Sequence, residues 1–254
     1  MSELVRHLPG GTSPATPARW LAGRLAVVTG ASRGIGAATA EAMAAAGAHV
    51  VLAARDRHAL DAVAGRITHA GGQAWPVPTD VNDEAAVERL FATVAGAGQL
   101  SALVCAAGVL TPAPFTETTA AIWAETLGIN LTGTFLCCRA AFTAMVPAGE
   151  GRIVNIGSLS GVYATEKFPG LAAYNVSKYG VIGLTEAIAV EGKEDGISAI
   201  CLSPGAVDTE MLRRANPALR PGLTPRDVAE LIVALLDGPL APASGANIPL
   251  FSNA

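Results

Sequence analysis

Short apolar runs alternate along the chain with longer segments in which apolar residues recur every three or four positions. The longer segments, such as GIGAATAEAMAAAGA and DEAAVERLFATVAGAG, predict helices with one apolar face. Continuous apolar runs of five to seven residues are typical of parallel strands covered on both faces. The runs are LAVVT (25–29), HVVLAA (49–54), QAWPV (73–77), SALVCA (101–106), GRIVNIG (151–157) and ISAICLS (197–203).

This alternation is a repeated strand–helix–strand unit, and it predicts an α/β fold with a Rossmann-type, doubly wound parallel sheet of about seven strands flanked by helices. A chain of 254 residues can bury one substantial core. Residues 1–20 are rich in Pro, Gly, Ser and Thr and have no periodicity. We therefore expect a flexible extension at 1–20 and a single domain at 21–254.

Composition narrows the possible partners and locations. The chain is 51% hydrophobic and 15% charged, as expected of a globular protein. No continuous apolar run reaches the roughly 18 residues of a membrane span, and the first residues lack the apolar centre of a signal peptide. We expect a cytoplasmic protein with no membrane partner. The net charge of -4, without a dense basic stripe, argues against nucleic acid binding.

Cysteines and histidines give no sign of a metal site. The four cysteines have no CxxC spacing, and the four histidines have no paired ligand spacing. We expect buried free thiols and no metal. The cysteines are Cys105, Cys137, Cys138 and Cys201, and the histidines are His7, His49, His58 and His69.

The first apolar run leads directly into TGASRGIG, in which Gly30, Gly34 and Gly36 precede an alanine-rich helical segment. Glycines at such a turn let the backbone approach a pyrophosphate, whose charge the free N–H groups at the helix start stabilise. A tight turn without a ligand would carry the same glycines. Their position between an expected strand and an expected helix favours nucleotide binding.

The end of the second apolar run indicates which nucleotide is bound. NAD-binding proteins place an acidic residue there, against the ribose 2'-hydroxyl. Here Ala54 takes that place and Arg55 follows it, while Arg33 in the glycine loop adds a second cation. Guanidinium groups bind phosphate, so the sequence favours NADP(H) over NAD(H). Asp56 would be the ribose-binding acid if the strand ended one or two residues later.

Two further segments carry candidate polar groups. Asp80, followed by Val81 after the third run, is a candidate partner of the adenine, although a turn residue or helix cap would look the same.

In YNVSK, Tyr174 and Lys178 lie on one face of a helix. A nearby ammonium would favour the phenolate and lower the Tyr174 pKa from its usual value of about 10. An ordinary exposed helix is the alternative for this motif alone.

TGASRGIG, NIGSLSG, YNVSK and SPGAVDTEM occur in this order, and through them residues 22–250 resemble the short-chain dehydrogenase/reductase family in its short, single-domain form. The chain is similar to the NADP-dependent members, notably 3-oxoacyl-acyl-carrier-protein reductases. The resemblance implies an NADP(H)-dependent enzyme of the carbonyl reductase or alcohol dehydrogenase type, which interconverts a ketone and a secondary alcohol by hydride transfer.

The resemblance also implies roles for individual residues. Tyr174 would be the general acid/base, and Lys178 would lower its pKa and hold the nicotinamide ribose. Ser158 would bind the substrate oxygen, and Asn130 would hold a water that links Lys178 to solvent. A hydride arriving at a carbonyl carbon leaves charge on oxygen, which needs a donor and then a proton. The implied cofactor-binding residues are Gly30, Ser32, Arg33, Gly34, Ile35, Gly36, Arg55, Asp80, Val81, Ala107, Gly108, Lys178, Pro204, Gly205, Val207 and Thr209.

Three segments depart from the family pattern. Cys105-Ala106-Ala107-Gly108 replaces the usual Asn-Asn-Ala-Gly, which removes side-chain bonds that brace the sheet. The segment 159–173 is a few residues longer than usual, and its apolar residues are candidates for substrate contact or for packing of the loop itself. These residues are Val162, Tyr163, Phe168 and Leu171. Residues 213–223 form a short lid, which suggests an open pocket for a bulky or tethered substrate.

Other functions explain fewer of these residues. A nucleotide-binding scaffold or sensor without catalysis would need only some of the four catalytic candidates. A methyltransferase would leave Tyr174, Lys178 and Arg55 without a role. A serine hydrolase is disfavoured because no histidine follows Ser158. From the resemblance we expect a homotetramer or homodimer acting on a small-molecule carbonyl or alcohol.

Overall fold

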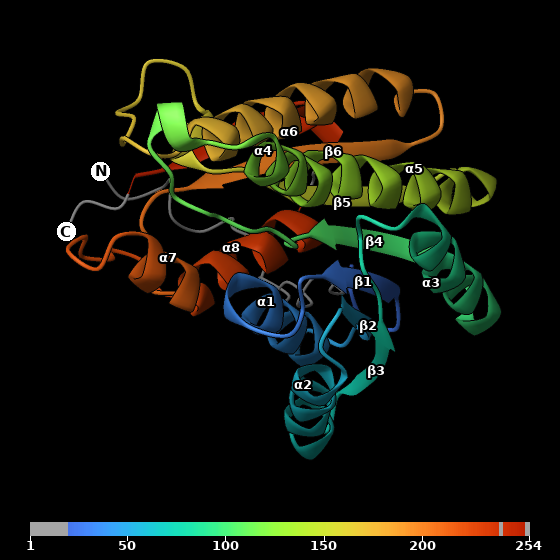
Figure 1. The fold of residues 1–254 in the computed structure, drawn as a ribbon. Coiled ribbons are helices and arrows are strands. Elements are labelled where there is room, and N and C mark those ends of the chain that lie inside the picture. Colours follow the sequence, from blue (N-terminus) through green and yellow to red (C-terminus); the bar gives the residue numbers. More distant parts are fainter. Residues whose placement is uncertain (1–19, 239–240, 252–254) are drawn as a thin grey trace, which may run out of the picture.

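The computed structural model describes residues 20–238 and 241–251. Seven parallel strands form one sheet in the order β3-β2-β1-β4-β5-β6-β7 (Figure 1). The expected doubly wound Rossmann-type sheet is therefore confirmed, while all but the last residue of the expected N-terminal extension lies outside the described residues. The strands are β1 (Leu25–Thr29), β2 (His49–Ala54), β3 (Gln73–Pro78), β4 (Leu100–Cys105), β5 (Gly151–Ile156), β6 (Ile197–Pro204) and β7 (Asn247–Leu250).

Helices cover both faces of the sheet (Figure 1). Helices α1, α2 and α8 pack in one core and α3 and α5 in the other, with α4 and α6 beside α5. The helices are α1 (Gly34–Ala45), α2 (Arg57–His69), α3 (Glu84–Ala97), α4 (Ala120–Leu127), α5 (Gly133–Met145), α6 (Ala172–Glu191), α7 (Glu210–Ala215) and α8 (Pro225–Asp237). A π-helix, η2 (Gly128–Thr132), joins α4 to α5, and short 3-10 turns are η1 (Phe115–Glu117), η3 (Val146–Ala148), η4 (Leu159–Gly161) and η5 (Ala241–Ala243).

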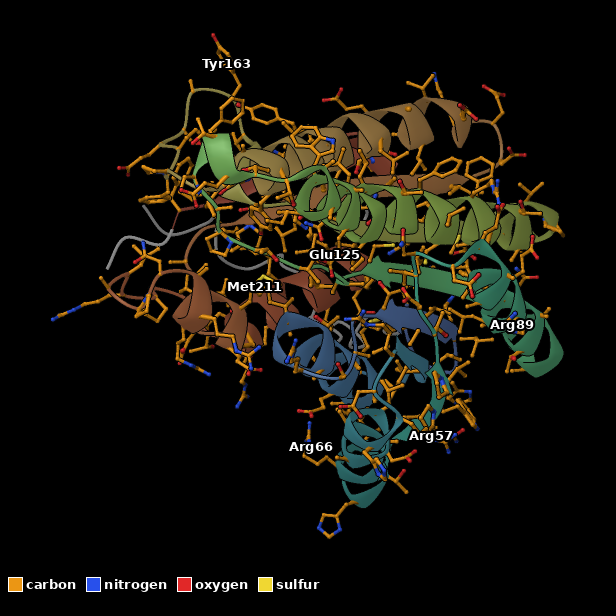
Figure 2. All side chains as sticks on the ribbon, viewed as in Figure 1. Arg57, Arg66, Arg89, Glu125, Tyr163 and Met211 are labelled. Carbon is orange, nitrogen blue, oxygen red and sulfur yellow. The ribbon has the colours of Figure 1, made fainter. Side chains whose placement is uncertain are left out.

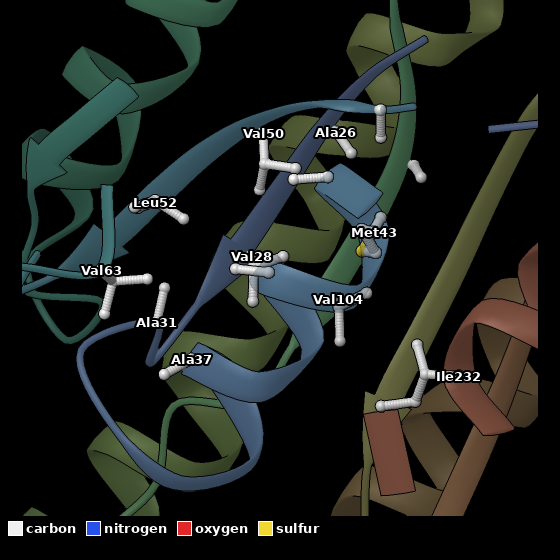
Figure 3. Packing of buried hydrophobic residues seen from close by; sticks show 14 of the residues in the cluster. Ala26, Val28, Ala31, Ala37, Met43, Val50, Leu52, Val63, Val104 and Ile232 are labelled. Atoms are coloured by element: carbon white, nitrogen blue, oxygen red, sulfur yellow. The ribbon is translucent and has the colours of Figure 1, made fainter. Parts of the chain in front are cut away.

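Side-chain alternation along each strand produces the two cores. Ala26 and Val28 pack under α1, α2 and α8, whereas Leu25 and Val27 pack against the opposite layer. Figure 3 shows part of the first core, where Met43 and the small side chain of Ala37 bring α1 close to the strands. Burial on both faces explains why continuous apolar runs, rather than alternating ones, mark these strands in the sequence.

The chain reverses its direction across the sheet between β1 and β4. It runs from β1 outward to β3 and then returns to β4 on the other side of β1. The carboxyl ends of β1 and β4 therefore flank a topological switch point, where ligands of such sheets bind. The glycine loop follows β1 at this edge, and residues 106–108 follow β4.

Helices α4, η2 and α5 form one continuous helical stretch, Ala120–Ala148, with a mean hydropathy of 1.3. By length and composition it is apolar enough to cross a membrane, and half of its apolar window is buried inside the protein. Glu125 and Arg139 interrupt the apolar run, so a search for continuous apolar residues does not find it. Core helices of globular proteins have the same composition, so this helix is weak evidence for a membrane span.

Candidate functional site

The glycine loop between β1 and α1 has a backbone that side chains would disrupt. Gly30 and Gly34 have positive φ angles of 65° and 56°. A Cβ atom on Gly30 would lie 2.6 Å from the Ala107 backbone nitrogen, and one on Gly36 would lie 2.3 Å from the Gly30 carbonyl oxygen. Helix α1 starts here without a side-chain cap, which leaves its first N–H groups available to an anion.

A groove of about 950 Å³ runs along the loop and the switch point. It contains twelve of the residues proposed for the cofactor: Gly30, Ser32, Arg33, Gly34, Ile35, Gly36, Arg55, Asp80, Val81, Ala107, Gly108 and Thr209. The other proposed residues, Lys178, Pro204, Gly205 and Val207, do not line it. Val207 is a buried core residue that pairs with Leu223, so its side chain is not part of the groove.

The expected end of the second strand is confirmed at Ala54, and Arg55 follows it as an exposed residue. Asp56 is the N-cap of α2, and its Oδ1 accepts a hydrogen bond of 3.1 Å from the Ala59 backbone nitrogen. Capping gives Asp56 a structural role even though it lines the groove. Among the described ion pairs and hydrogen bonds none involves the Arg55 side chain, so this cation faces the groove without a protein partner.

Asp80 has a similar structural bond. Its Oδ1 accepts from the Asn82 backbone nitrogen at 3.0 Å, which forms a turn before α3. Val81 behind it is buried. Both residues line the groove, so the turn and contact with a ligand are compatible.

Lys178 on α6 is buried and points its ammonium at the carboxyl end of β5. Its Nζ donates a hydrogen bond of 2.7 Å to the Ile156 carbonyl oxygen. Burial lowers the pKa of Lys178 to about 8, against the opposing effect of the Cys201 and Cys105 thiols. The ammonium also lies 5.7 Å from the centre of the Tyr174 ring.

Tyr174 is therefore close to Lys178, but the expected effect on its pKa is wrong for this structure. Burial raises the pKa of Tyr174, and the hydrogen bond with the Ser158 side chain opposes the rise only in part. Lys178 does not lower the pKa of Tyr174 in this structure. Its ammonium donates its hydrogen bond to the Ile156 carbonyl oxygen. The Tyr174 phenol is thus protonated at neutral pH in this structure.

Ser158 comes directly after β5 and caps the turn η4, where its Oγ accepts from the Ser160 backbone nitrogen at 3.1 Å. The carboxyl end of β5 and the first turns of α6 thus bring Ser158, Tyr174 and Lys178 together. The i,i+4 spacing predicted that Tyr174 and Lys178 lie close together, and the catalytic roles of the three residues stay a prediction.

Asn130 lies in the π-helix η2 and is fully buried. Its side chain exchanges two hydrogen bonds with the Val109 backbone, at 2.8 and 2.9 Å, and donates a third of 3.0 Å to Ser177 Oγ. These bonds hold the segment after β4 against α6. A Cβ atom on Gly108 would lie 3.4 Å from Asn130 Oδ1 and 3.9 Å from Lys178 Nζ, so these two side chains flank the same point of the backbone.

The segment 159–173 folds around Lys167, which the sequence did not single out. Its Nζ donates to the Val162 carbonyl oxygen at 2.7 Å and to Thr165 Oγ1 at 2.6 Å. Tyr163, proposed for substrate contact, is 86% exposed and points away from the body of the molecule (Figure 2). It therefore forms no wall of the site. Val162, Phe168 and Leu171 are half-buried or partly exposed and do not line the groove either.

A chain of side-chain contacts starts at Cys105, one of the positions where the family pattern has asparagine. All four cysteines are buried and free, as expected. Cys105 Sγ lies 3.9 Å from Cys138 Sγ, which donates to Asn155 Oδ1 at 3.3 Å. Asn155 in turn donates to Thr185 Oγ1 at 3.0 Å. This chain of contacts links β4, α5, β5 and α6. Among the described residues no group of three or more His, Cys, Asp or Glu side chains is placed to hold a metal ion.

The segment after β6 covers one side of the groove. Thr209 caps α7, because its Oγ1 accepts a hydrogen bond of 3.2 Å from the Leu212 backbone nitrogen. Thr209 also lies close to the glycine loop, since a Cβ atom on Gly34 would be 3.4 Å from Thr209 Cγ2. The lid expected at 213–223 thus begins with helix α7. Ala54 and Asp56, which were considered at the expected strand end, also line the groove. Sequence reasoning missed its other lining residues, which are Ala37, Ala38, Glu41, Ala59, Arg66, Thr79, Ala106, Val109, Ile129, Asp208, Glu210, Met211, Arg213 and Pro225.

Residues 24–220 match the model of a protein family described as short chain dehydrogenase. The chain belongs to the short-chain dehydrogenase/reductase family. It is 36% identical over 231 residues to 3-oxoacyl-[acyl-carrier-protein] reductase of Synechocystis sp., which covers 87% of this chain and 92% of the relative. It is 39% identical over 224 residues to cis-4-hydroxycyclohexanecarboxylate dehydrogenase of Sinomonas cyclohexanicum, covering 84% and 88%.

A solved structure extends the likeness to three dimensions. The crystal structure of 3-oxoacyl (acyl-carrier-protein) reductase from Agrobacterium tumefaciens, with NADP bound, superimposes with a TM-score of 0.85 at 28% identity. The match covers 96% of this chain and 99% of the other. This protein is thus an oxidoreductase of the short-chain dehydrogenase/reductase family, whose fold binds a nicotinamide cofactor. It is similar to 3-oxoacyl-acyl-carrier-protein reductases.

Proposed function

We propose that this protein uses NADP(H) to interconvert a ketone and a secondary alcohol by hydride transfer, with Tyr174 as general acid/base. The observation that carries the proposal is the cluster of Ser158, Tyr174 and Lys178 beside the carboxyl end of β5. A protein that only binds a nucleotide would need Lys178 for the ribose, but it would not need the phenol of Tyr174 and the hydroxyl of Ser158 beside each other.

The groove has the chemistry of a dinucleotide site. The N–H groups at the start of α1 would hold the pyrophosphate, and the glycine loop leaves room for it. Arg55 would bind the 2'-phosphate, because it lines the groove and no carboxylate among the described residues pairs with it. NADP bound to the similar A. tumefaciens reductase supports the same preference here. When bound, the reduced nicotinamide supplies the hydride.

The catalytic residues would stabilise the negative charge on the substrate oxygen and then protonate it. As the carbonyl carbon accepts a hydride, negative charge develops on its oxygen. The Ser158 hydroxyl would donate a hydrogen bond to this oxygen, and Tyr174 would transfer its proton to it. The Tyr174 phenol is protonated at neutral pH and so carries this proton, although burial makes it a weaker acid than a free tyrosine. In the reverse direction the phenolate would take the proton from the alcohol, and Lys178 would hold the nicotinamide ribose.

The relatives indicate the range of substrates. One is named for a 3-oxoacyl group on a carrier protein and the other for a cyclic hydroxy acid. Both names describe a ketone or a secondary alcohol attached to a larger acidic or tethered group. We propose the same class of substrate for this protein.

We further propose a homotetramer or homodimer in which α4, α5 and α6 contribute the contact. Trp123, Phe135 and Tyr179 on these helices are exposed by 39%, 40% and 40%. Exposed aromatic side chains on neighbouring helices favour association. Light scattering after gel filtration measures the mass directly, and a monomer would contradict this proposal.

The function is tested by the loss of absorbance at 340 nm with NADPH and with NADH, against acetoacetyl thioesters, bulky cyclic ketones and small diketones. We expect turnover that depends on the ketone and is faster with NADPH. Tyr174→Phe should abolish it, whereas Tyr163→Phe, a change at the exposed tip of the loop, should retain it. Turnover that survives in Tyr174→Phe, or a preference for NADH, would contradict the proposal.

A further inference from the structure

Glu210, the first residue of α7, pairs with Arg33, the arginine of the glycine loop. Arg33 Nη1 lies 2.8 Å from Glu210 Oε2, and both residues line the groove. The other oxygen of Glu210 forms an ion pair with Arg214, one turn further along α7. Glu210 thus lies between two guanidinium groups. Its carboxylate partly neutralises Arg33 and so weakens the attraction of Arg33 for an anionic ligand.

Arg55 differs from Arg33 in this respect. Among the described residues no carboxylate pairs with Arg55, whereas Arg33 is engaged with Glu210 across the groove. The two arginines come from different elements, the glycine loop and the end of β2. A ligand phosphate between them would meet one unpaired cation and one cation that is shared with a carboxylate.

We propose that Glu210 sets how strongly NADP(H) is preferred, by competing with the 2'-phosphate for Arg33. The inference rests on the proposed function, because it places a 2'-phosphate beside Arg33 and Arg55. The Glu210 carboxylate weakens NADP(H) binding in two ways: it occupies a donor of Arg33, and its negative charge repels the phosphate. NAD(H) has no 2'-phosphate, so its affinity does not depend on this competition.

The size of the effect follows from the exposure of the pair. The side chains of Arg33 and Glu210 are 69% and 41% exposed. Exposed ion pairs are weak, so their loss changes an equilibrium by a small factor. Glu210→Gln removes the charge, keeps the shape and also releases Arg214. We expect about twofold to fivefold tighter NADP⁺ binding and unchanged NAD⁺ binding.

Calorimetric titration of the full-length protein tests this with NADP⁺ and NAD⁺, and with the fragments 2',5'-ADP and 5'-AMP, which differ only in the phosphate. Glu210→Gln should tighten NADP⁺ and 2',5'-ADP alone. Asp208→Asn is the matched charge control, because Asp208 is nearby and pairs with Arg213 instead of Arg33. It should change NADP⁺ affinity less than Glu210→Gln does. In an Arg33→Ala background the effect of Glu210→Gln should disappear.

Unchanged or weaker NADP⁺ binding in Glu210→Gln would overturn the competition, because Glu210 would then be neutral or would hold Arg33 ready for the phosphate. Equal tightening of NAD⁺, or an effect that persists without Arg33, would overturn it as well. The proposed cofactor preference fails separately, if the unmodified protein binds NAD⁺ more tightly than NADP⁺. Even in that case, comparing the NADP⁺ affinity of the unmodified protein with that of Glu210→Gln decides whether Glu210 competes for Arg33.

Discussion

Lys178 gives the protein a pH-dependent stability that can be measured without any substrate. Burial lowers its pKa from 10.5 to about 8. Between these two values the folded protein holds fewer protons on this lysine than the unfolded chain does. The free energy of unfolding therefore rises with pH, starting near pH 8. Lys178→Met removes the titrating group, and the variant should lack this rise.

The magnitude follows from the two pKa values. A difference of about 2.5 pKa units corresponds to about 3 kcal/mol over the whole titration. Between pH 7 and pH 9 the linkage relation gives about 1.3 kcal/mol. Burial raises the pKa values of Cys137 and Cys201, and the contact with the Cys138 thiol together with burial raises that of Cys105, which makes the folded protein less stable at high pH. These thiols are present in both proteins, so the comparison of the two cancels most of their effect.

The assay is urea unfolding of the unmodified protein and of Lys178→Met at half-unit steps from pH 7 to pH 9. We expect the difference in unfolding free energy to grow by about 1.3 kcal/mol in favour of the unmodified protein as pH rises. Lys193→Met, a change of an exposed lysine after α6, is the control and should show a constant difference. A constant difference for Lys178→Met too would refute the inferred burial of a charged lysine.

Three further changes test the glycine loop, a helix cap and the segment after β5. Gly36→Ala places a Cβ atom 2.3 Å from the Gly30 carbonyl oxygen, and we expect NADP⁺ affinity to fall at least about tenfold in calorimetry. The control Gly65→Ala, on an open face of α2, should retain affinity; equal affinity in both variants would contradict this account. Thr224→Ala removes the capping box of α8 and should cost about 1 kcal/mol in urea unfolding, and no loss would show that the cap is not needed. Lys167→Met removes the hydrogen bonds of Lys167 to Val162 and Thr165 and should loosen residues 159–171. We expect a severalfold higher KM for the ketone and faster proteolysis in this segment, with unchanged NADP⁺ affinity. An unaltered KM would argue against this role.

The sequence predicted the strands well because their burial on both faces leaves a simple pattern. Six of the seven strands lie within one residue of the apolar runs at each end. The seventh, Asn247–Leu250, was not located because it is short, half-buried and contains Pro249. The positions of Gly30 and Ser158 were also predictable, since ligand-binding loops follow strand ends in a doubly wound sheet.

Features that depend on where a side chain points were not predictable. The i,i+4 spacing placed Lys178 beside Tyr174, but it did not show that the ammonium binds the Ile156 carbonyl oxygen. Tyr163 is apolar enough for a substrate wall, yet the backbone turns it outward. The brace from Cys105 through Cys138 to Asn155 joins residues far apart in the sequence, and no local pattern marks it.

The most direct test of the central claim follows the hydride itself. The ketone that reacts fastest in the panel is incubated with NADPH carrying deuterium on the transferred position of C4, and the alcohol is analysed by mass spectrometry. The account expects one deuterium on the carbinol carbon with the unmodified protein and no alcohol with Tyr174→Phe. An alcohol without deuterium, or the same labelled alcohol at the same rate from Tyr174→Phe, would contradict it.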